Sequence, residues 1–157
     1  MSVAFRRESD DEHLEPKFEI PLPAGPNRVT RAGLAVIAER IAGIEQALAT
    51  APEAEAETLR RDLRYWQTRR ATAEWTPAPG DGTIGFGTLV TAMVAGRERR
   101  IAIVGDDEAD PKLDRIAFGA PLARALIGAE AGDELPFNGR DGAIRVLAVA
   151  AIDPPAA

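Results

Sequence analysis

The chain contains no cysteine, only one histidine and few aromatic residues, which make up 5% of its 157 positions. Without cysteine there is no disulfide framework and no thiolate metal site, and a reducing cytoplasm fits this absence. His13 has no second metal ligand near it, and one histidine in a polar leader cannot complete a catalytic triad. Because hydrophobic residues still make up 45% of the chain, we expect a core built from aliphatic side chains.

The chain also lacks an excess of positive charge, since 19 basic residues face 25 acidic ones and the net charge is -6. Phosphate contacts require Lys and Arg, so we expect no direct sequence-specific binding of DNA. No apolar run approaches the roughly 18 residues that span a bilayer, and the N-terminus lacks the apolar centre of a secretory signal. We expect a cytoplasmic monomer that does not enter a membrane.

The first two segments are a leader and a helical hairpin. Residues 1–28 are polar and proline-rich, carry four acids between Asp10 and Glu15, and show no periodicity, so we expect a disordered leader. Residues 29–75 are expected to form two antiparallel helices, 30–50 and 53–75, with Thr30 as the first N-cap. Apolar residues at alternating spacings of three and four predict a coiled-coil seam. The seam positions are Leu34, Ile37, Ile41, Ile44 and Leu48, then Ala56, Leu59, Leu63, Trp66, Arg70 and Ala73.

The remaining chain is expected to form a linker and a β domain, which makes the fold class α+β. Residues 76–82 are rich in proline and glycine and read as the linker. Residues 83–157 contain short β-patterned runs and one helix that begins at Pro121, where the first helical position favours proline. We expect an antiparallel sheet around this short helix. The expected strands cover 83–94, 99–104, 115–118, 134–137 and 142–152.

Four patterns in the β domain occur in a characteristic order. Arg100 to Gly105 reads as a strand that ends in valine and glycine, and an acidic loop follows from Asp106 to Pro111. A helix opens with Pro121, and the turn Gly132-Asp133 comes after it. In this order and spacing the patterns resemble bacterial transcription elongation factors of the Gre family, over about residues 28–152 of the chain.

The resemblance implies an FK506-binding-protein-like β domain that docks on RNA polymerase beside its secondary channel. It implies that the acidic loop and the edge before the short helix make the contact. The partner-binding residues expected on this basis are Asp106, Asp107, Glu108, Asp110, Gly119, Ala120, Pro121, Leu122 and Arg124. The chain departs from the family where members commonly carry Asp-Ser before the proline, because Gly119-Ala120 stands there.

The hairpin departs further, because Gre hairpins are several turns longer and end in an Asp-Leu-Ser-Glu-Asn-Ala-Glu-Tyr type tip. Here the tip contains Pro52, Glu53, Glu55 and Glu57. These acids have two interpretations. They could stabilise the positive end of the second helix dipole, or they could deliver carboxylates to the magnesium site of the polymerase. The arginines of the second helix, Arg60, Arg61, Arg64, Arg69 and Arg70, likewise read as a solvated face or as a contact for an acidic polymerase surface or nucleic acid.

The leading hypothesis is a regulator of transcription elongation that binds RNA polymerase and stimulates transcript cleavage poorly. It would be no enzyme, with no catalytic residue, metal site or cofactor of its own. The acidic loop lacks the glycine and glutamate spacing of an EF-hand, so a solvated turn is expected there. The first alternative is a cleavage-stimulating factor that uses the tip glutamates. The second is a peptidyl-prolyl isomerase, although the C-terminal part has only three aromatic residues with which to line a proline pocket.

Overall fold

The computed structural model describes residues 19–154, which fall into two compact units. One unit contains residues 19–25 and Ile37–Ala71, and the other contains Pro26–Val36 and the described chain from Thr72 onward. The acids between Asp10 and Glu15, together with His13, lie outside the described residues. The end of the predicted leader, from Pro26, therefore belongs to the unit that also contains the sheet.

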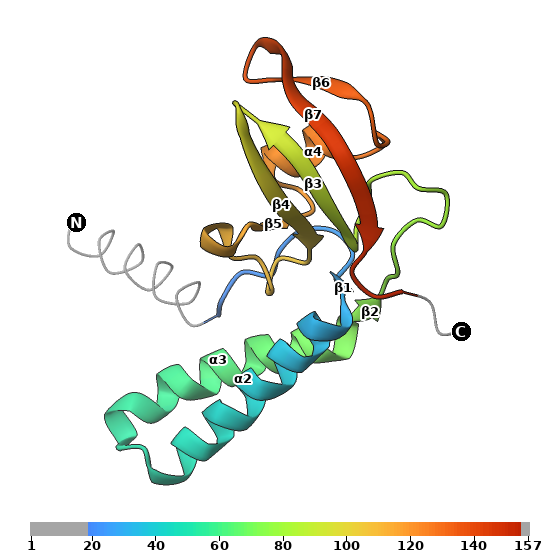
Figure 1. The fold of residues 1–157 in the computed structure, drawn as a ribbon. Coiled ribbons are helices and arrows are strands. Elements are labelled where there is room, and N and C mark those ends of the chain that lie inside the picture. Colours follow the sequence, from blue (N-terminus) through green and yellow to red (C-terminus); the bar gives the residue numbers. More distant parts are fainter. Residues whose placement is uncertain (1–18, 155–157) are drawn as a thin grey trace, which may run out of the picture. The chain divides into compact units, whose positions relative to one another are not determined.

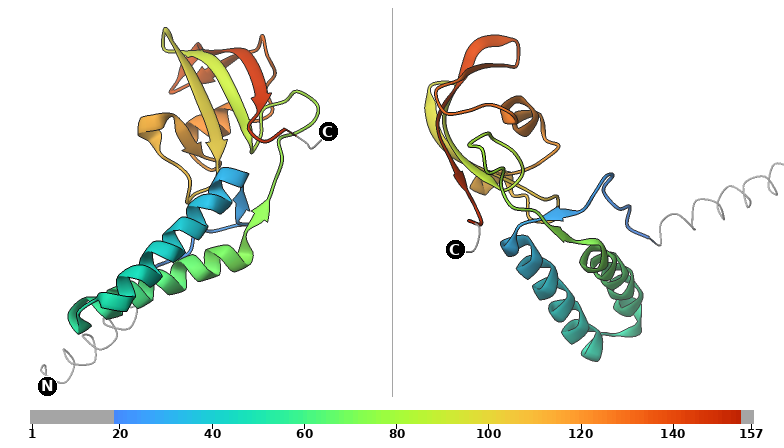
Figure 2. Two further views of the ribbon diagram at one scale, coloured as in Figure 1. Left: turned by 60° about the horizontal axis from the view of Figure 1, so that its bottom comes forward. Right: turned by 90° about the vertical axis from the view of Figure 1, so that its right-hand side faces the viewer.

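The helical hairpin predicted from the seam is confirmed (Figure 1). Helix α2 covers Arg31–Thr50 and helix α3 covers Glu53–Thr72, with 20 residues in each. The two-residue turn between them makes the helices antiparallel, and they lie side by side in the views of Figure 2. Each helix is about 30 Å long at ~1.5 Å per residue.

The seam is confirmed at its centre but not at every position. Ile37 and Ile41 are buried on α2, and Ala56 is buried on α3. Leu34, which the spacing assigns to the seam, is 38% exposed. The spacing also assigns Arg70 to the seam, but Arg70 is exposed and its neighbour Arg69 is buried instead.

A short parallel pair of strands forms at the predicted end of the leader and at the predicted end of the second helix. Strand β1, Arg28–Val29, pairs with strand β2, Glu74–Trp75. The Glu74 amide donates to the Asn27 carbonyl at 2.8 Å, and the Thr76 amide donates to the Val29 carbonyl at 3.0 Å. The second helix therefore ends at Thr72 rather than at residue 75, because its last predicted residues satisfy their backbone groups in a sheet.

The β domain contains a five-stranded sheet with the strand order β5-β4-β3-β7-β6. Neighbouring strands of the sheet are antiparallel except for β4 and β5, which run parallel. The prediction of an antiparallel sheet was therefore wrong at this pair. Strand β3 alternates buried and half-buried residues along its length, which is the period of two that a strand requires. The strands are β3 Thr88–Val94, β4 Arg97–Val104, β5 Arg115–Ala117, β6 Glu134–Phe137 and β7 Arg140–Ala151.

Helix α4, Pro121–Leu126, packs on this sheet and begins at the predicted proline. Its buried residues Ala123 and Leu126 join an aliphatic cluster, as the scarcity of aromatic residues predicted. Burying one such Ile or Leu side chain stabilises the fold by about 1.5–3 kcal/mol. The cluster is formed by Ile84, Val90, Ala92, Val94, Ile101, Ile103, Ile116, Ala123, Leu126, Ala129, Ile144 and Val146.

Candidate functional site

The acidic loop and the start of α4 meet at one edge of the sheet. Val104, the last residue of β4, pairs with Ala117, the last residue of the parallel strand β5. Parallel neighbours end on the same side of a sheet, so the segments that follow them emerge next to each other. The Phe118 amide donates to the Val104 carbonyl at 3.0 Å and extends this pairing by one step. The two sequence segments predicted to contact a partner therefore form one surface, which we name the β4–β5 edge surface (residues 105–110 and 118–124).

The acidic loop is a folded turn rather than a uniformly solvated one. The Asp110 side chain accepts a hydrogen bond from the Lys112 amide at 3.2 Å and caps the 3-10 helix η2, Pro111–Leu113. The backbones of Asp110 and Arg115 also exchange hydrogen bonds of 2.8 and 3.1 Å. Asp106 is exposed, whereas Asp107 is half-buried. Asp106 is consequently the carboxylate of this loop that is most accessible to a partner.

Glu108 does not share the exposure expected of the acidic loop, because it is 9% exposed. Its Oε1 accepts a hydrogen bond from the hydroxyl of Thr30, whose own side chain is fully buried. The Thr30 hydroxyl also accepts from the Gly33 amide at 3.0 Å, which confirms Thr30 as the N-cap of α2. Glu108 therefore anchors the loop to the first turn of α2, a structural role that the sequence did not reveal.

The start of α4 supplies the second half of the surface. Gly119, Pro121 and Arg124 are exposed, while Leu122 is half-buried and packs partly against the core. Ala120 occupies the N-cap position with extended backbone and makes no side-chain capping bond. The position where the resembled family commonly carries serine therefore lacks both a cap and a polar group.

Two residues at this edge were missed by the sequence analysis. The guanidinium of Arg28 lies 5.2 Å from the centre of the Phe118 ring, and the Phe118 and Phe86 rings are 6.1 Å apart. Because the Phe118 side chain is still 37% exposed, Phe118 and Arg28 together present an apolar face and a positive charge. Arg28 had been assigned to the leader, and no local pattern links it to a ring 90 positions later.

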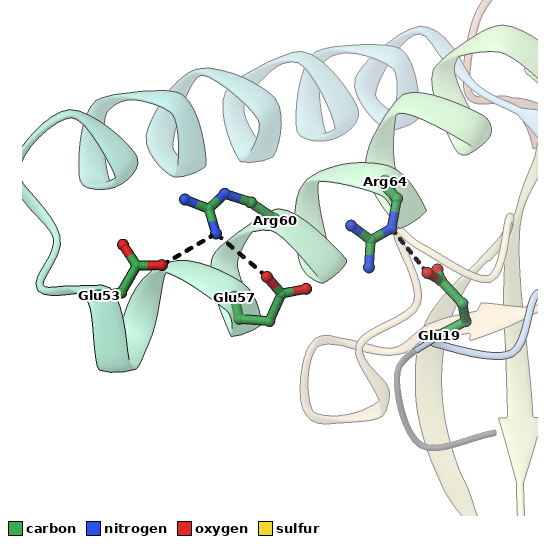
Figure 3. Close-up of polar contacts among 5 residues, drawn as sticks. All are labelled: Glu19, Glu53, Glu57, Arg60 and Arg64. Atoms are coloured by element: carbon green, nitrogen blue, oxygen red, sulfur yellow. Dashed lines mark hydrogen bonds and ion pairs between the residues drawn. The ribbon is translucent and has the colours of Figure 1, made fainter. Parts of the chain in front are cut away.

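Two of the three tip glutamates, Glu53 and Glu57, lie beside Arg60, as Figure 3 shows. Arg60 Nη1 lies 3.7 Å from the Glu53 carboxylate and 3.2 Å from the Glu57 carboxylate, so one guanidinium pairs with both and offsets one of their two negative charges. Glu55 instead lines a shallow hollow with Ala51 and Pro52. Glu53 and Glu55 also fall in the first turn of α3, where acids favour the helix dipole.

Within the described residues no three His, Cys, Asp or Glu side chains are gathered in a way that could hold a metal ion. The described helices include none that is both long and apolar enough to cross a membrane. The β4–β5 edge surface combines carboxylates, the exposed Phe118 ring and Arg124, and Arg28 lies against that ring.

Comparison with known proteins identifies the β domain. Residues 79–154 match the family described as "Transcription elongation factor, GreA/GreB, C-term". The chain is 38% identical over 85 residues to transcription elongation factor GreA of Vibrio parahaemolyticus, covering 53% of this chain and 54% of the relative. It is 41% identical over 68 residues to GreA of Legionella pneumophila, covering 42% of each protein. The chain thus spans about half the length of the curated relatives it matches.

Solved structures also resemble the chain, at lower identity. The crystal structure of GreA factor homolog 1 (Gfh1) of Thermus thermophilus is 18% identical and has a TM-score of 0.37, with 80% of this chain and 99% of that chain covered. The GreA/GreB elongation factor from Nitrosomonas europaea is 20% identical with a TM-score of 0.36, covering 80% and 98%. The C-terminal part of the chain, residues 79–154, is similar to the C-terminal domain of GreA/GreB transcription elongation factors.

Proposed function

We propose that this protein binds RNA polymerase through the β4–β5 edge surface, at the entrance of the secondary channel, and regulates elongation there. The observation that carries the proposal is the parallel pairing of β4 and β5, which joins the acidic loop and the start of α4 within a GreA/GreB C-terminal domain. The exposed Asp106 and Pro121 give this surface a charge and a rigid apolar contact. Such a contact needs no cofactor and no catalytic residue, and a cytoplasmic monomer is sufficient for it.

We further propose that the protein stimulates transcript cleavage poorly. A carboxylate that helps hold a catalytic cation must come within about 2–2.6 Å of it. In this chain Glu53 and Glu57 form exposed ion pairs with Arg60, which offset part of the negative charge that a cation would need, although such pairs break at a cost of only about 0–1 kcal/mol. The helices are about 30 Å long by the rise of ~1.5 Å per residue, shorter than the hairpins of the family that the sequence resembles. The tip is therefore suited to partial entry into a channel rather than to metal chemistry.

A transcript-cleavage assay on a backtracked elongation complex tests this second claim. A cleavage-competent GreA serves as the positive control, and RNA shortening is followed on a sequencing gel. We expect the wild-type chain to shorten the RNA little above the rate of polymerase alone. Strong shortening that disappears when Glu53, Glu55 and Glu57 are all changed to Ala would establish the alternative, a cleavage factor.

A further inference from the structure

Helix α3 presents two arginines on one face, one helical turn apart. Arg60 and Arg64 are separated by four residues, and their side chains are 47% and 44% exposed. Each already contacts a carboxylate, since Arg60 pairs with the tip glutamates and Arg64 Nε lies 2.8 Å from Glu19 Oε1 (Figure 3). Residues 60–70 of α3 contain five arginines and the single acid Asp62. We name the side that carries Arg60, Arg61 and Arg64 the arginine face.

The segment that follows Glu19 runs along α3 in a defined direction. Ile20 and Leu22 line a hollow with side chains of the second half of the helix, which are Tyr65, Gln67, Thr68 and Ala71. Farther along, the Asn27 side-chain amide donates to the Thr72 hydroxyl at 3.1 Å. The chain thus reaches Arg64 first and the last residue of α3 afterwards. The turn of α3 that carries Arg60 and Arg61 comes directly before Arg64 in the helix, on the side away from Thr72.

We propose that the acidic part of the leader, residues 8–15, binds the arginine face of α3 in the same molecule. This part contains Glu8, Asp10, Asp11, Glu12 and Glu15 and no basic residue, so its charge is opposite to that of the face. The Glu19–Arg64 ion pair holds the chain next to the face shortly after the acidic segment. An extended chain covers ~3.3 Å per residue, so the few residues between the segment and Glu19 are long enough for the segment to reach the turn that carries Arg60. Single exposed ion pairs are weak, but a tethered segment has an effective concentration in the millimolar range. The acidic segment therefore occupies the face ahead of other anions, such as nucleic-acid phosphates.

The absence of cysteine allows a direct test on the full chain. A His13→Cys variant has one thiol, to which a nitroxide spin label is attached, and its paramagnetic broadening of backbone amide NMR signals is mapped. We expect the amides from Glu57 to Arg64 to lose at least about half their intensity at low salt. They should recover near 1 M salt, where the Debye length falls to about 3 Å.

Matched variants separate charge pairing from chance proximity. Neutralising the segment (Asp10→Asn, Asp11→Asn, Glu12→Gln, Glu15→Gln) or the face (Arg61→Gln with Arg64→Gln) should abolish the broadening. Arg97→Gln, an exposed arginine of β4, should leave it unchanged. Broadening that is uniform, restricted to residues next to the label in sequence, or insensitive to neutralisation would overturn the proposal. Broadening that appears only between labelled and unlabelled molecules would also overturn it, because the face would then bind the acidic segment of a second copy. Because no polymerase is present, failure here leaves the proposed polymerase binding untouched.

Discussion

The hydroxyl of Thr30 donates a hydrogen bond to the carboxylate of Glu108, and both side chains are buried. The two residues are 78 positions apart, yet this contact joins the N-cap of α2 to the acidic loop that follows β4. The loop that we propose to contact polymerase is thereby fixed to the start of the first hairpin helix. Its outer carboxylate, Asp106, is left free to face a partner.

Glu108→Ala is expected to destabilise the protein, because it leaves the buried Thr30 hydroxyl without its acceptor. An unsatisfied buried polar group costs about 1–3 kcal/mol of unfolding free energy. Chemical denaturation followed by circular dichroism gives this value. Asp106→Ala, an exposed change in the same loop, should alter stability by no more than about 0.5 kcal/mol. Equal stability of the two variants would refute a structural role for Glu108.

Gly105→Ala is expected to destabilise the protein through a backbone clash. A Cβ atom at this position would lie 2.4 Å from the carbonyl oxygen of Arg28, and two backbones would have to separate. We expect a loss of about 1–3 kcal/mol in unfolding free energy, the range for overpacked sites. Gly119→Ala is the control, since no atom lies within 4 Å of its added Cβ. A tolerated Gly105→Ala would mean that β1 does not hold its position against this loop.

Ala120→Ser should stabilise the protein by supplying the missing N-cap of α4. The backbone at Ala120 is already extended, with φ -67° and ψ 151°, so a serine hydroxyl can accept from the first turn without rearrangement. A serine cap is worth about 0.5–2 kcal/mol relative to alanine. Thermal unfolding measures the gain, and Ala120→Val, which cannot cap, is the matched control. An Ala120→Ser variant no more stable than the valine variant would contradict the assigned cap position.

Asp81 should titrate below its ordinary range, because the Thr83 hydroxyl and then the Thr83 amide donate to its carboxylate and lower its pKa. A lowered pKa means that the folded state favours the ionised form. This stabilisation is present above the ordinary pKa of Asp and is lost as the pH falls through the lower pKa of the folded state. In Thr83→Val the hydroxyl bond is removed and the amide bond remains, so the pKa should rise part of the way back. An Asp81 titration by NMR that the substitution leaves unmoved would exclude this cause.

Local rules predicted the elements that are defined by neighbouring residues. Thr30 caps α2, Pro121 opens α4, and the aliphatic alternation of β3 gives a strand with one buried face. Each of these features depends on residues within a few positions of one another, which is the range over which capping, propensity and periodicity act. The hairpin was predictable for the same reason, because a two-residue turn leaves little choice of direction.

Features that join distant residues were not predictable. The parallel pairing of β4 and β5, the strand formed by Arg28–Val29 and the inward turn of Glu108 are contacts between separate segments. An acidic run favours solvent on average, and nothing within the loop distinguishes Glu108 from Asp106. The sequence indicated the two segments that form the β4–β5 edge surface. Only the sheet topology places these segments next to each other.

The affinity of the full chain for RNA polymerase core enzyme tests the central proposal most directly. The comparison is between wild type and the double variant Asp106→Lys with Pro121→Ser. Arg140→Ala is the control, at the β6–β7 turn on the end of the sheet opposite the carboxyl ends of β4 and β5. We expect wild type and the control to bind alike and the double variant to bind at least about tenfold more weakly, a difference of ~1.4 kcal/mol. Equal binding by all three, or no binding by the wild-type chain, would contradict the proposal.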